Sequence, residues 1–378
     1  MNGYKRTTVL FLSVVFALSA IAFVARAEDN KISNLRTNAE QGVAEAQFKL
    51  GLAYGLGMDV PKDEVEAVKW YRKAADLNYP AAQAKLGDCY AKGRGVEKNE
   101  TDAVNWIRKA ADQDYPPAQY DLGFHYEWGR GVQKDPAEAM KWYRKAADQN
   151  LDIAQFFLGV GYATGKGVEN NPVEAAKWLR KAADQNFPEA QSRLGTAYAT
   201  GQGVEKDEQE AARWYRKAAE NGCAEAQYGL GNCYAGARGV PADFEEAAKW
   251  YRKAAEQNYD AAQFNLGLLY YNGKGVEKNA KEASNWFLKA AYQDYGPAKV
   301  FLGIEYANGE GVSSSVVEAY AWLNLAADTE ELGAKYRNSL VKKMSDQETA
   351  DGEKRTKELR AEIQTKGRSD IEVQKPNP

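Results

Sequence analysis

Ser339 and Lys342 have the Ser-x-x-Lys spacing, which places a serine hydroxyl one helical turn from a lysine amine. Penicillin-binding enzymes use such a pair for acyl transfer, together with Ser-Asp-Asn and Lys-Thr-Gly motifs. Neither companion motif occurs in this chain. Because the pair also falls in a predicted terminal helix, we interpret it as a chance match and predict that the protein is not an enzyme.

The residue types that bind metals and cofactors are scarce. One histidine, His125, and three cysteines exclude a multi-histidine metal site and a four-cysteine zinc site. Glycine-rich turns such as Gly93-Arg94-Gly95-Val96 follow predicted helices rather than strands, so they do not indicate phosphate binding. The 50 basic and 53 acidic residues give a formal charge of −3, without a basic surface for nucleic acid. We expect no cofactor, no metal and no nucleic-acid partner.

A tryptophan that recurs every 36 residues organises the chain. The recurring tryptophans are Trp70, Trp106, Trp142, Trp178, Trp214, Trp250, Trp286 and Trp322. Leu50, Gly51, Tyr54 and Val60 recur with the same period. Trp128 is the only tryptophan outside the series. A fixed period of this length predicts a tandem repeat protein.

Each repeat is predicted to form two helices. Ala46, Leu50 and Tyr54 lie on one stripe of the first helix, and the recurring Trp-Tyr pair marks the buried face of the second. A Gly-x-Gly-Val turn joins them. Three residues after its valine stands a good N-cap residue for the second helix: Asp63, Asn99, Asp135, Asn171, Asp207, Asp243, Asn279 or Ser315. We interpret the Arg-Lys pairs that begin with Arg72-Lys73 as a solvated outer face.

Stacking of the helix pairs would build one continuous core. The predicted fold class is therefore all-α, an α/α superhelical solenoid of about eight 36-residue helix-turn-helix repeats with terminal cap helices. We place the repeats at 44–330, an N-terminal cap at 28–43, C-terminal cap helices at 331–366 and a disordered tail at 367–378. The second cap helix is expected to open with the capping box Ser345-Asp346-Gln347-Glu348.

Residues 1–27 have the pattern of a secretory signal peptide. Lys5 and Arg6 precede an apolar stretch, and Ala25-Arg26-Ala27 supplies small residues at the two positions that a signal peptidase needs. An uncleaved membrane anchor is the alternative, and the stretch is short for it. Cleavage would remove three basic residues and no acid, which changes the formal charge from −3 to −6. We expect a protein exported across the inner membrane, periplasmic or extracellular, that does not insert into a membrane after cleavage.

The repeat pattern A-x-A-Q-x-x-L-G-x-x-Y-x-x-G-x-G-V-x-x-D-x-x-x-A-x-x-W-Y-R-K-A-A resembles the Sel-one-like repeat (SLR), a relative of the tetratricopeptide repeat. Ala190–Ala219 matches every motif position from the second alanine of the pattern onward, and the resemblance covers roughly residues 44–330. Asp59 and Ala237 each replace a turn glycine, and Lys299 replaces the recurring glutamine. The resemblance implies a protein-binding adaptor without shared catalytic residues, so the function has to come from the positions that vary.

By analogy with tetratricopeptide solenoids, the first helix of each repeat is expected to line the concave surface. Its variable positions become apolar and aromatic in repeats 3 and 4. The candidate partner-binding residues are Asp121, Phe124, His125, Trp128, Phe157 and Val160. Packing between repeats explains an apolar cluster here equally well. Variation among the equivalents of His125 predicts that this histidine is a surface residue.

These observations predict a non-enzymatic adaptor or scaffold of the periplasm or cell envelope that binds a protein or peptide on the concave face. Two alternatives stay open. One is a penicillin-interacting, β-lactamase-like envelope enzyme, because cysteine-rich members of the resembled family have been associated with penicillin binding. The other is a structural component of envelope assembly that uses its convex face.

Overall fold

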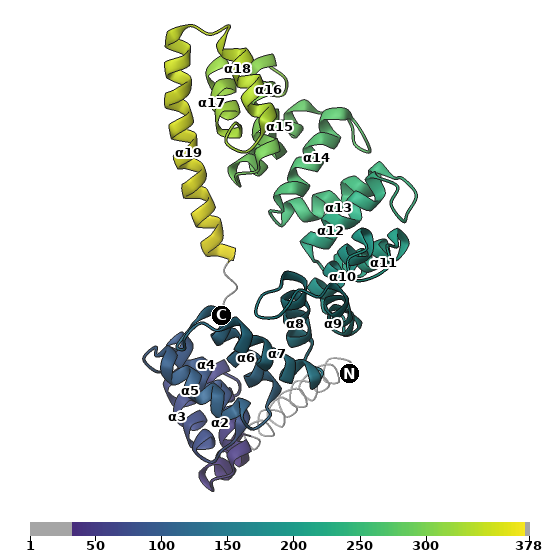
Figure 1. Cartoon of the computed structure of the whole chain (residues 1–378). Coiled ribbons are helices and arrows are strands. Elements are labelled where there is room, and N and C mark those ends of the chain that lie inside the picture. Colours follow the sequence, from purple (N-terminus) through teal and green to yellow (C-terminus); the bar gives the residue numbers. More distant parts are fainter. Residues whose placement is uncertain (1–31, 375–378) are drawn as a thin grey trace, which may run out of the picture. The chain divides into compact units, whose positions relative to one another are not determined.

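The computed structural model describes residues 32–374, and over this range the chain is helical with no strand (Figure 1). Each repeat contributes a first helix, helix A, and a second helix, helix B. The A helices are α2 (Ala44–Leu56), α4 (Pro80–Lys92), α6 (Pro116–Trp128), α8 (Asp152–Thr164), α10 (Pro188–Thr200), α12 (Ala224–Ala235), α14 (Asp260–Asn272) and α16 (Gly296–Asn308). The B helices are α3 (Glu64–Asp76), α5 (Glu100–Ala111), α7 (Pro136–Asp148), α9 (Pro172–Asp184), α11 (Glu208–Glu220), α13 (Phe244–Glu256), α15 (Ala280–Tyr292) and α17 (Val316–Ala326). The predicted fold class is confirmed.

The chain divides into two compact units, an N-terminal unit that ends at Asn170 and a C-terminal unit that begins at Asn171. The division falls between the two helices of the fourth repeat. Within each unit the helices pack against their neighbours in sequence, and helix B contacts helix A of both its own repeat and the next. Each unit is thus a stack of helical hairpins.

Every helix B begins at the residue type predicted to cap it. The side chains of all eight predicted N-caps accept a hydrogen bond from a backbone N–H in the first turn. The Asp63 carboxylate, for example, accepts from the Glu66 N–H at 2.9 Å. Each such cap stabilises its helix by about 1 kcal/mol. The repeating sequence therefore fixes the start of every second helix.

The recurring tryptophans form the core, as predicted. Seven of the eight are buried, and Trp106 is half-buried. Trp142 packs with Leu122 of its own repeat and with Ile107 and Ala118, which places one side chain across two repeats. A core built in this way joins each repeat to its neighbour rather than stabilising it alone.

The Arg-Lys pairs lie on a face that is exposed to solvent, as the sequence suggested, and the lysine of each pair is exposed. Each arginine from Arg72 to Arg252 donates a hydrogen bond to the tyrosine hydroxyl of the next repeat, as Arg108 does to Tyr126 at 2.8 Å. The lysine lies over the tryptophan of its own helix, with Lys73 Nζ 3.9 Å from the Trp70 ring centroid. The solvated face is therefore confirmed, and its long side chains also lie along aromatic rings and join one repeat to the next.

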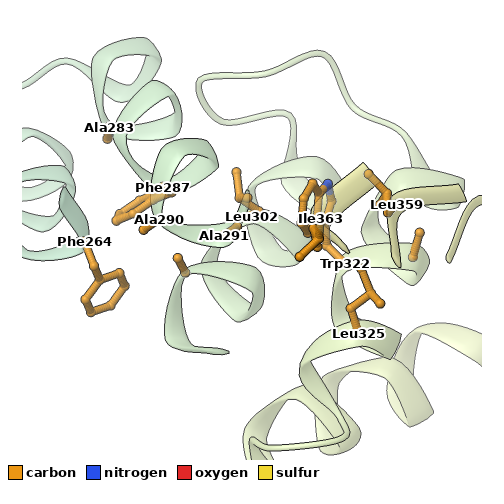
Figure 2. Close-up of a cluster of buried hydrophobic side chains, with 12 residues drawn as sticks. Phe264, Ala283, Phe287, Ala290, Ala291, Leu302, Trp322, Leu325, Leu359 and Ile363 are labelled. Atoms are coloured by element: carbon orange, nitrogen blue, oxygen red, sulfur yellow. The ribbon is translucent and has the colours of Figure 1, made fainter. Parts of the chain in front are cut away.

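The two ends of the repeat array are capped. Residues 32–40 form a helix whose Ala39 packs with Leu50 and Trp70. At the other end, α18 (Glu331–Val341) precedes α19 (Asp346–Gln374), which packs on α17 and α15. Figure 2 shows Leu359 and Ile363 of α19 beside Trp322 and Leu325 of α17, where the Arg-Lys pair of the other repeats is replaced. The cap shields an apolar face that a further repeat would otherwise cover.

The predicted capping box opens α19. Ser345 Oγ accepts a hydrogen bond from the Glu348 N–H, and Glu348 Oε2 accepts from the Ser345 N–H at 2.8 Å. The helix continues to Gln374, past the boundary at 366 and through most of the segment predicted to be a disordered tail. That segment lacks an apolar period, which was the basis of the prediction, but a helix can continue on local propensity alone. Residues 1–27, the predicted signal peptide, lie outside the described residues.

The second glycine of each turn sets the spacing between repeats. At Gly203, where φ is +73°, an added Cβ would lie 1.9 Å from the Pro172 carbonyl oxygen at the start of the preceding helix B. At Gly201, where φ is +76°, the nearest atom to an added Cβ would be Lys206 Cβ, at 3.3 Å. Ala237 replaces the equivalent of Gly201 and keeps a φ of +53°. Only the second glycine is therefore required by contact as well as by conformation.

We predict that Gly203→Ala destabilises the protein much more than Gly201→Ala. Both variants place alanine at a left-handed φ, which costs about 1–2 kcal/mol. Gly203→Ala adds a clash with backbone, and overpacking of this kind costs a further 1–3 kcal/mol or so. Thermal unfolding followed by circular dichroism would measure the difference. Equal losses in the two variants would contradict the role assigned to the contact.

Candidate functional site

The variable positions of the A helices in the N-terminal unit share one side of each helix, and together we call them the helix-A face. It consists of Lys49, Leu52, Leu56, Lys85, Asp88, Lys92, Asp121, Phe124, Trp128, Phe157, Val160 and Thr164. None of these side chains is buried. The spacing i, i+3, i+7 places them on one side of each helix, away from the stripe that packs on helix B.

Trp128 is the most conspicuous residue of this face. It is the last residue of α6 and is 54% exposed, although it is a large aromatic side chain. Its ring lies 6.2 Å from that of Phe124 and 4.9 Å from Lys166 Nζ, measured to the ring centroid. Arg130 covers the Phe124 ring at 5.1 Å. Trp128 therefore lies outside the repeat core, and two cations help to hold the aromatic pair in place.

Asp121 forms the acidic rim of the aromatic pair. Burial raises the pKa of its carboxyl to about 6, the charge of Asp88 on α4 raises it further, and Lys92 and Lys85 oppose the shift. Lys92 pairs with Asp88 at 2.6 Å. The charges on α4 and α6 therefore form one cluster beside Phe124 and Trp128.

Phe157 and Val160 lie deeper than Trp128. The Phe157 ring packs 5.5 Å from both Tyr120 and Tyr143, so much of its surface serves packing between repeats 3 and 4. Val160 lines a small cavity of about 60 Å³ beside Phe157. For Phe157, the alternative of packing between repeats describes the geometry better than a surface anchor does.

His125 is not a surface residue, and that prediction was wrong. It is 6% exposed, and its Nδ1 is 2.8 Å from the Arg130 carbonyl oxygen. Burial lowers the pKa of the imidazole. The equivalents of His125 are buried in every repeat: Ala53, Cys89, Gly161, Ala197, Cys233, Leu269 and Glu305. Variation at this position reflects local packing under the turn rather than contact with a partner.

Sequence reasoning missed a cavity of about 390 Å³ between the first two repeats. Leu52, Gly55 and Tyr71 of repeat 1 line it together with Lys85 and Arg94 of repeat 2. Gly55 is the residue in the sequence that could have indicated this cavity. Its equivalents are larger in every other repeat: Ala91, Glu127, Ala163, Ala199, Ala235, Tyr271 and Ala307.

Ser339 and Lys342 lie at the end of α18. Both are exposed, and Lys342 is the C-cap residue of the helix. Ser339 lines a cavity of about 320 Å³ with Tyr336 and Lys343, and Lys342 is not part of that lining. A nucleophilic serine needs a base within hydrogen-bond reach, and no hydrogen bond joins these two side chains in the described structure.

The model of the Sel1 repeat matches eight consecutive segments, 44–79, 80–115, 116–151, 152–187, 188–223, 224–259, 260–295 and 296–328. The chain belongs to the Sel1 repeat family. Each matched segment begins at helix A and ends just after helix B, as the sequence period predicted. Proteins of this repeat family are generally scaffolds for protein–protein interaction.

Two solved structures illustrate the likeness. A Sel1 repeat protein from Oxalobacter formigenes is 33% identical, with a TM-score of 0.62 and coverage of 82% of this chain and 89% of that one. A protective antigen of uropathogenic Escherichia coli with an SLR fold is 31% identical over 91% of this chain and 90% of its own, with a TM-score of 0.47. A search of curated proteins finds no match. Within residues 32–374, no helix is both long and apolar enough to cross a membrane.

Glu305, the equivalent of His125 in repeat 8, generates a prediction about pH. It is 1% exposed, and burial raises the pKa of its carboxyl to about 7, above the ordinary 4.5 that applies when the chain is unfolded. The folded protein therefore holds a proton that the unfolded chain releases between these values, so stability falls as pH rises through this window. We predict that Glu305→Gln removes a pH-dependent loss on the order of 2–3 kcal/mol.

Melting temperatures of the two proteins between pH 4.5 and 8 would measure this effect. The variant should gain most over the wild type above pH 7 and little at pH 4.5. Glu277→Gln is the matched control, because it removes the same charge from an exposed position of the same unit. A pH profile for Glu305→Gln that parallels that of the wild type would contradict the prediction.

Proposed function

We propose that this Sel1 repeat protein is a non-enzymatic scaffold that binds a protein or peptide on the helix-A face of repeats 3 and 4. The proposal rests on the exposure of Trp128 on this face. The core of every repeat uses the tryptophan of helix B, so a second tryptophan in repeat 3 adds nothing that the repeat itself requires. Exposed tryptophans at the centre of a surface are typical anchors of protein interfaces.

The surroundings of Trp128 support a preformed binding surface. Phe124 and Trp128 pack on each other on α6, and Lys166 and Arg130 contact this aromatic pair from two neighbouring turns. Lys166 Nζ also pairs with Glu127 at 2.6 Å, which restrains the cation above the ring. An anchor that is already held in place loses less conformational entropy when a partner binds.

The rim of this surface indicates the kind of partner. Asp121, Asp88, Lys85 and Lys92 present both signs of charge beside an apolar centre. Such a rim favours a polar peptide segment that carries an apolar or aromatic side chain for Phe124, Trp128 and Val160. His125 and Phe157 would support this surface from below, the first by filling the space under the turn and the second by packing on Tyr143.

We also propose that the protein works in the periplasm or outside the cell. Support comes from the basic start, apolar stretch and small residues of 1–27, and from the acidic mature chain. The acidic charge disfavours nucleic acid and anionic membrane surfaces as partners. A role in envelope assembly through the opposite face remains the alternative for the same compartment. The geometry around Ser339 does not favour the penicillin-interacting enzyme.

We predict that Trp128→Ala weakens partner binding at little cost in stability. Truncation of a central aromatic anchor commonly costs 2 kcal/mol or more of binding free energy. Trp142→Ala removes a buried core side chain and should cost about 3–5 kcal/mol of unfolding free energy. Photo-crosslinking from position 128 in the native envelope would identify the partner, and titration with the purified partner would give the affinities.

Leu77→Ala is the control for this comparison. Leu77 is exposed to a similar degree at the end of α3, in helix B rather than on the helix-A face. Its loss should leave partner affinity unchanged. If Trp128→Ala lowers the melting temperature as much as Trp142→Ala does, Trp128 is a core residue and the proposed surface is wrong.

We predict that the exported protein begins at Glu28. Ala25 and Ala27 occupy the −3 and −1 positions of a signal peptidase site. N-terminal sequencing of protein from the periplasm or the culture medium would test this. Recovery of a chain that still contains residues 1–27 from the membrane fraction would instead indicate an anchored protein.

A further inference from the structure

The cavity of about 390 Å³ between repeats 1 and 2 has the size of a small-molecule binding site. Leu52, Leu56 and Ala67 supply apolar lining, and Tyr71 lies at its base. Three cations and two carboxylates also line it: Lys62, Lys85, Arg94, Glu64 and Asp88. Lys62 pairs with Glu64 at 2.8 Å, and Asp88 is held by Lys85 and Lys92, so the acids are neutralised from within the protein.

Tyr71 is 2% exposed, yet its hydroxyl has no hydrogen-bond partner in the described structure. The other tyrosines at this position of helix B all have one. Tyr143 donates to Glu127 at 2.6 Å, Tyr215 lies 3.0 Å from the Thr196 hydroxyl, and Tyr251 donates to Asn232 at 2.7 Å. The Tyr71 hydroxyl borders the cavity and is accessible from it, so it can donate a hydrogen bond to a ligand that enters there.

The equivalent cavity between repeats 3 and 4 indicates which chemical group the cavity between repeats 1 and 2 can hold. Most of the residues that line the cavity of about 60 Å³ there are the equivalents, 72 positions on, of residues that line the larger cavity. Glu127 stands where repeat 1 has Gly55, and Met140 stands where it has Val68. One Glu127 oxygen accepts from Tyr143, and the other accepts from Lys166 Nζ at 2.6 Å. In repeats 3 and 4 the site is therefore filled by the protein's own carboxylate.

We propose that the cavity between repeats 1 and 2 binds an organic carboxylate with a short apolar body. The ligand carboxylate takes the place of the missing Glu127 equivalent, accepts a hydrogen bond from the Tyr71 hydroxyl and faces Arg94, the equivalent of Lys166. The apolar body lies against Leu52 and Leu56. This site shares Lys85 and Asp88 with the rim of the surface around Trp128 but has its own apolar lining, and its occupation does not depend on the scaffold function.

The chemistry of the lining agrees with an anionic ligand. Burial raises the pKa of the Tyr71 hydroxyl, so the group keeps its proton and acts as a donor. A hydrogen bond from a neutral hydroxyl to a carboxylate is stronger than one between neutral groups. Gly55 leaves room for the ligand, since an added Cβ there would already lie 3.1 Å from the Tyr71 hydroxyl.

The test uses hexanoate as the probe and titrates it against the full-length protein by ligand-observed NMR. For a ligand of this size we expect saturable binding with a Kd of about 1 mM or below. Hexanol should bind about tenfold more weakly, because it lacks the charge. No saturation by hexanoate, or hexanol binding as tightly as hexanoate, would overturn the proposal.

Three variants locate the site. Tyr71→Phe keeps the ring and removes the donor, so it should weaken hexanoate binding about tenfold. Gly55→Glu installs the carboxylate that repeat 3 carries and should abolish binding while keeping the fold. Tyr143→Phe removes the equivalent hydroxyl from the filled site and should leave the hexanoate Kd within about twofold of the wild-type value. Unchanged binding in both Tyr71→Phe and Gly55→Glu would place the ligand elsewhere and refute the assignment.

A peptide probe distinguishes the source of the carboxylate. Acetyl-Ala-Leu-Glu-amide carries it on a side chain, as Glu127 does. If this peptide binds more tightly than hexanoate and is also lost in Gly55→Glu, the site takes an acidic side chain of a protein partner. If hexanoate binds more tightly, the site takes a free carboxylic acid. Absence of binding by both probes contradicts the proposal.

Discussion

Close packing of the two helices in a repeat depends on a glycine of helix A that faces a large side chain of helix B. At Gly51 an added Cβ would lie 2.7 Å from the Tyr71 ring, and at Gly123 it would lie 2.7 Å from the Tyr143 ring. Isoleucine, phenylalanine or leucine takes the tyrosine's place in other repeats, with Ile107, Phe287 and Leu323 just as near their glycines. No other residue allows this approach.

This contact also determines where the tyrosine hydroxyl can form a hydrogen bond. A tyrosine ring that lies on the glycine extends its hydroxyl toward the last turn of helix A. The residues of that turn then decide whether the hydroxyl meets a carboxylate, an amide, another hydroxyl or an open cavity. Repeats with the same backbone therefore differ, through one or two side chains, in the group that meets this hydroxyl. The same turn carries Trp128, so the aromatic anchor and the cavity are both products of the end of helix A.

The sequence predicts the features that every repeat shares. The period, the N-caps and the buried tryptophans all follow from patterns that recur eight times, so each is supported many times over. His125 shows the limit, because variation at a position can mean local packing as well as exposure. The hydrogen bond made by the arginine of the Arg-Lys pair was not predicted, because its partner, a tyrosine hydroxyl, belongs to the next repeat. The cavity depends on the absence of a side chain at Gly55, and its volume follows only from the positions of the surrounding helices.

The contacts between successive repeats have a consequence for how such a chain can change in length. The second turn glycine contacts the start of the preceding helix B. The recurring glutamine donates a hydrogen bond to a carbonyl group near the end of that helix B. The arginine of helix B donates a hydrogen bond to the tyrosine hydroxyl of the next repeat. All three contacts cross the segment between helix B and the next helix A, so an insertion or deletion of a few residues there would shift all of them out of register at once. Loss or duplication of a whole repeat would preserve every one. Growth in steps of 36 residues is therefore the tolerated route, and it would leave the two terminal caps free to close arrays of different length.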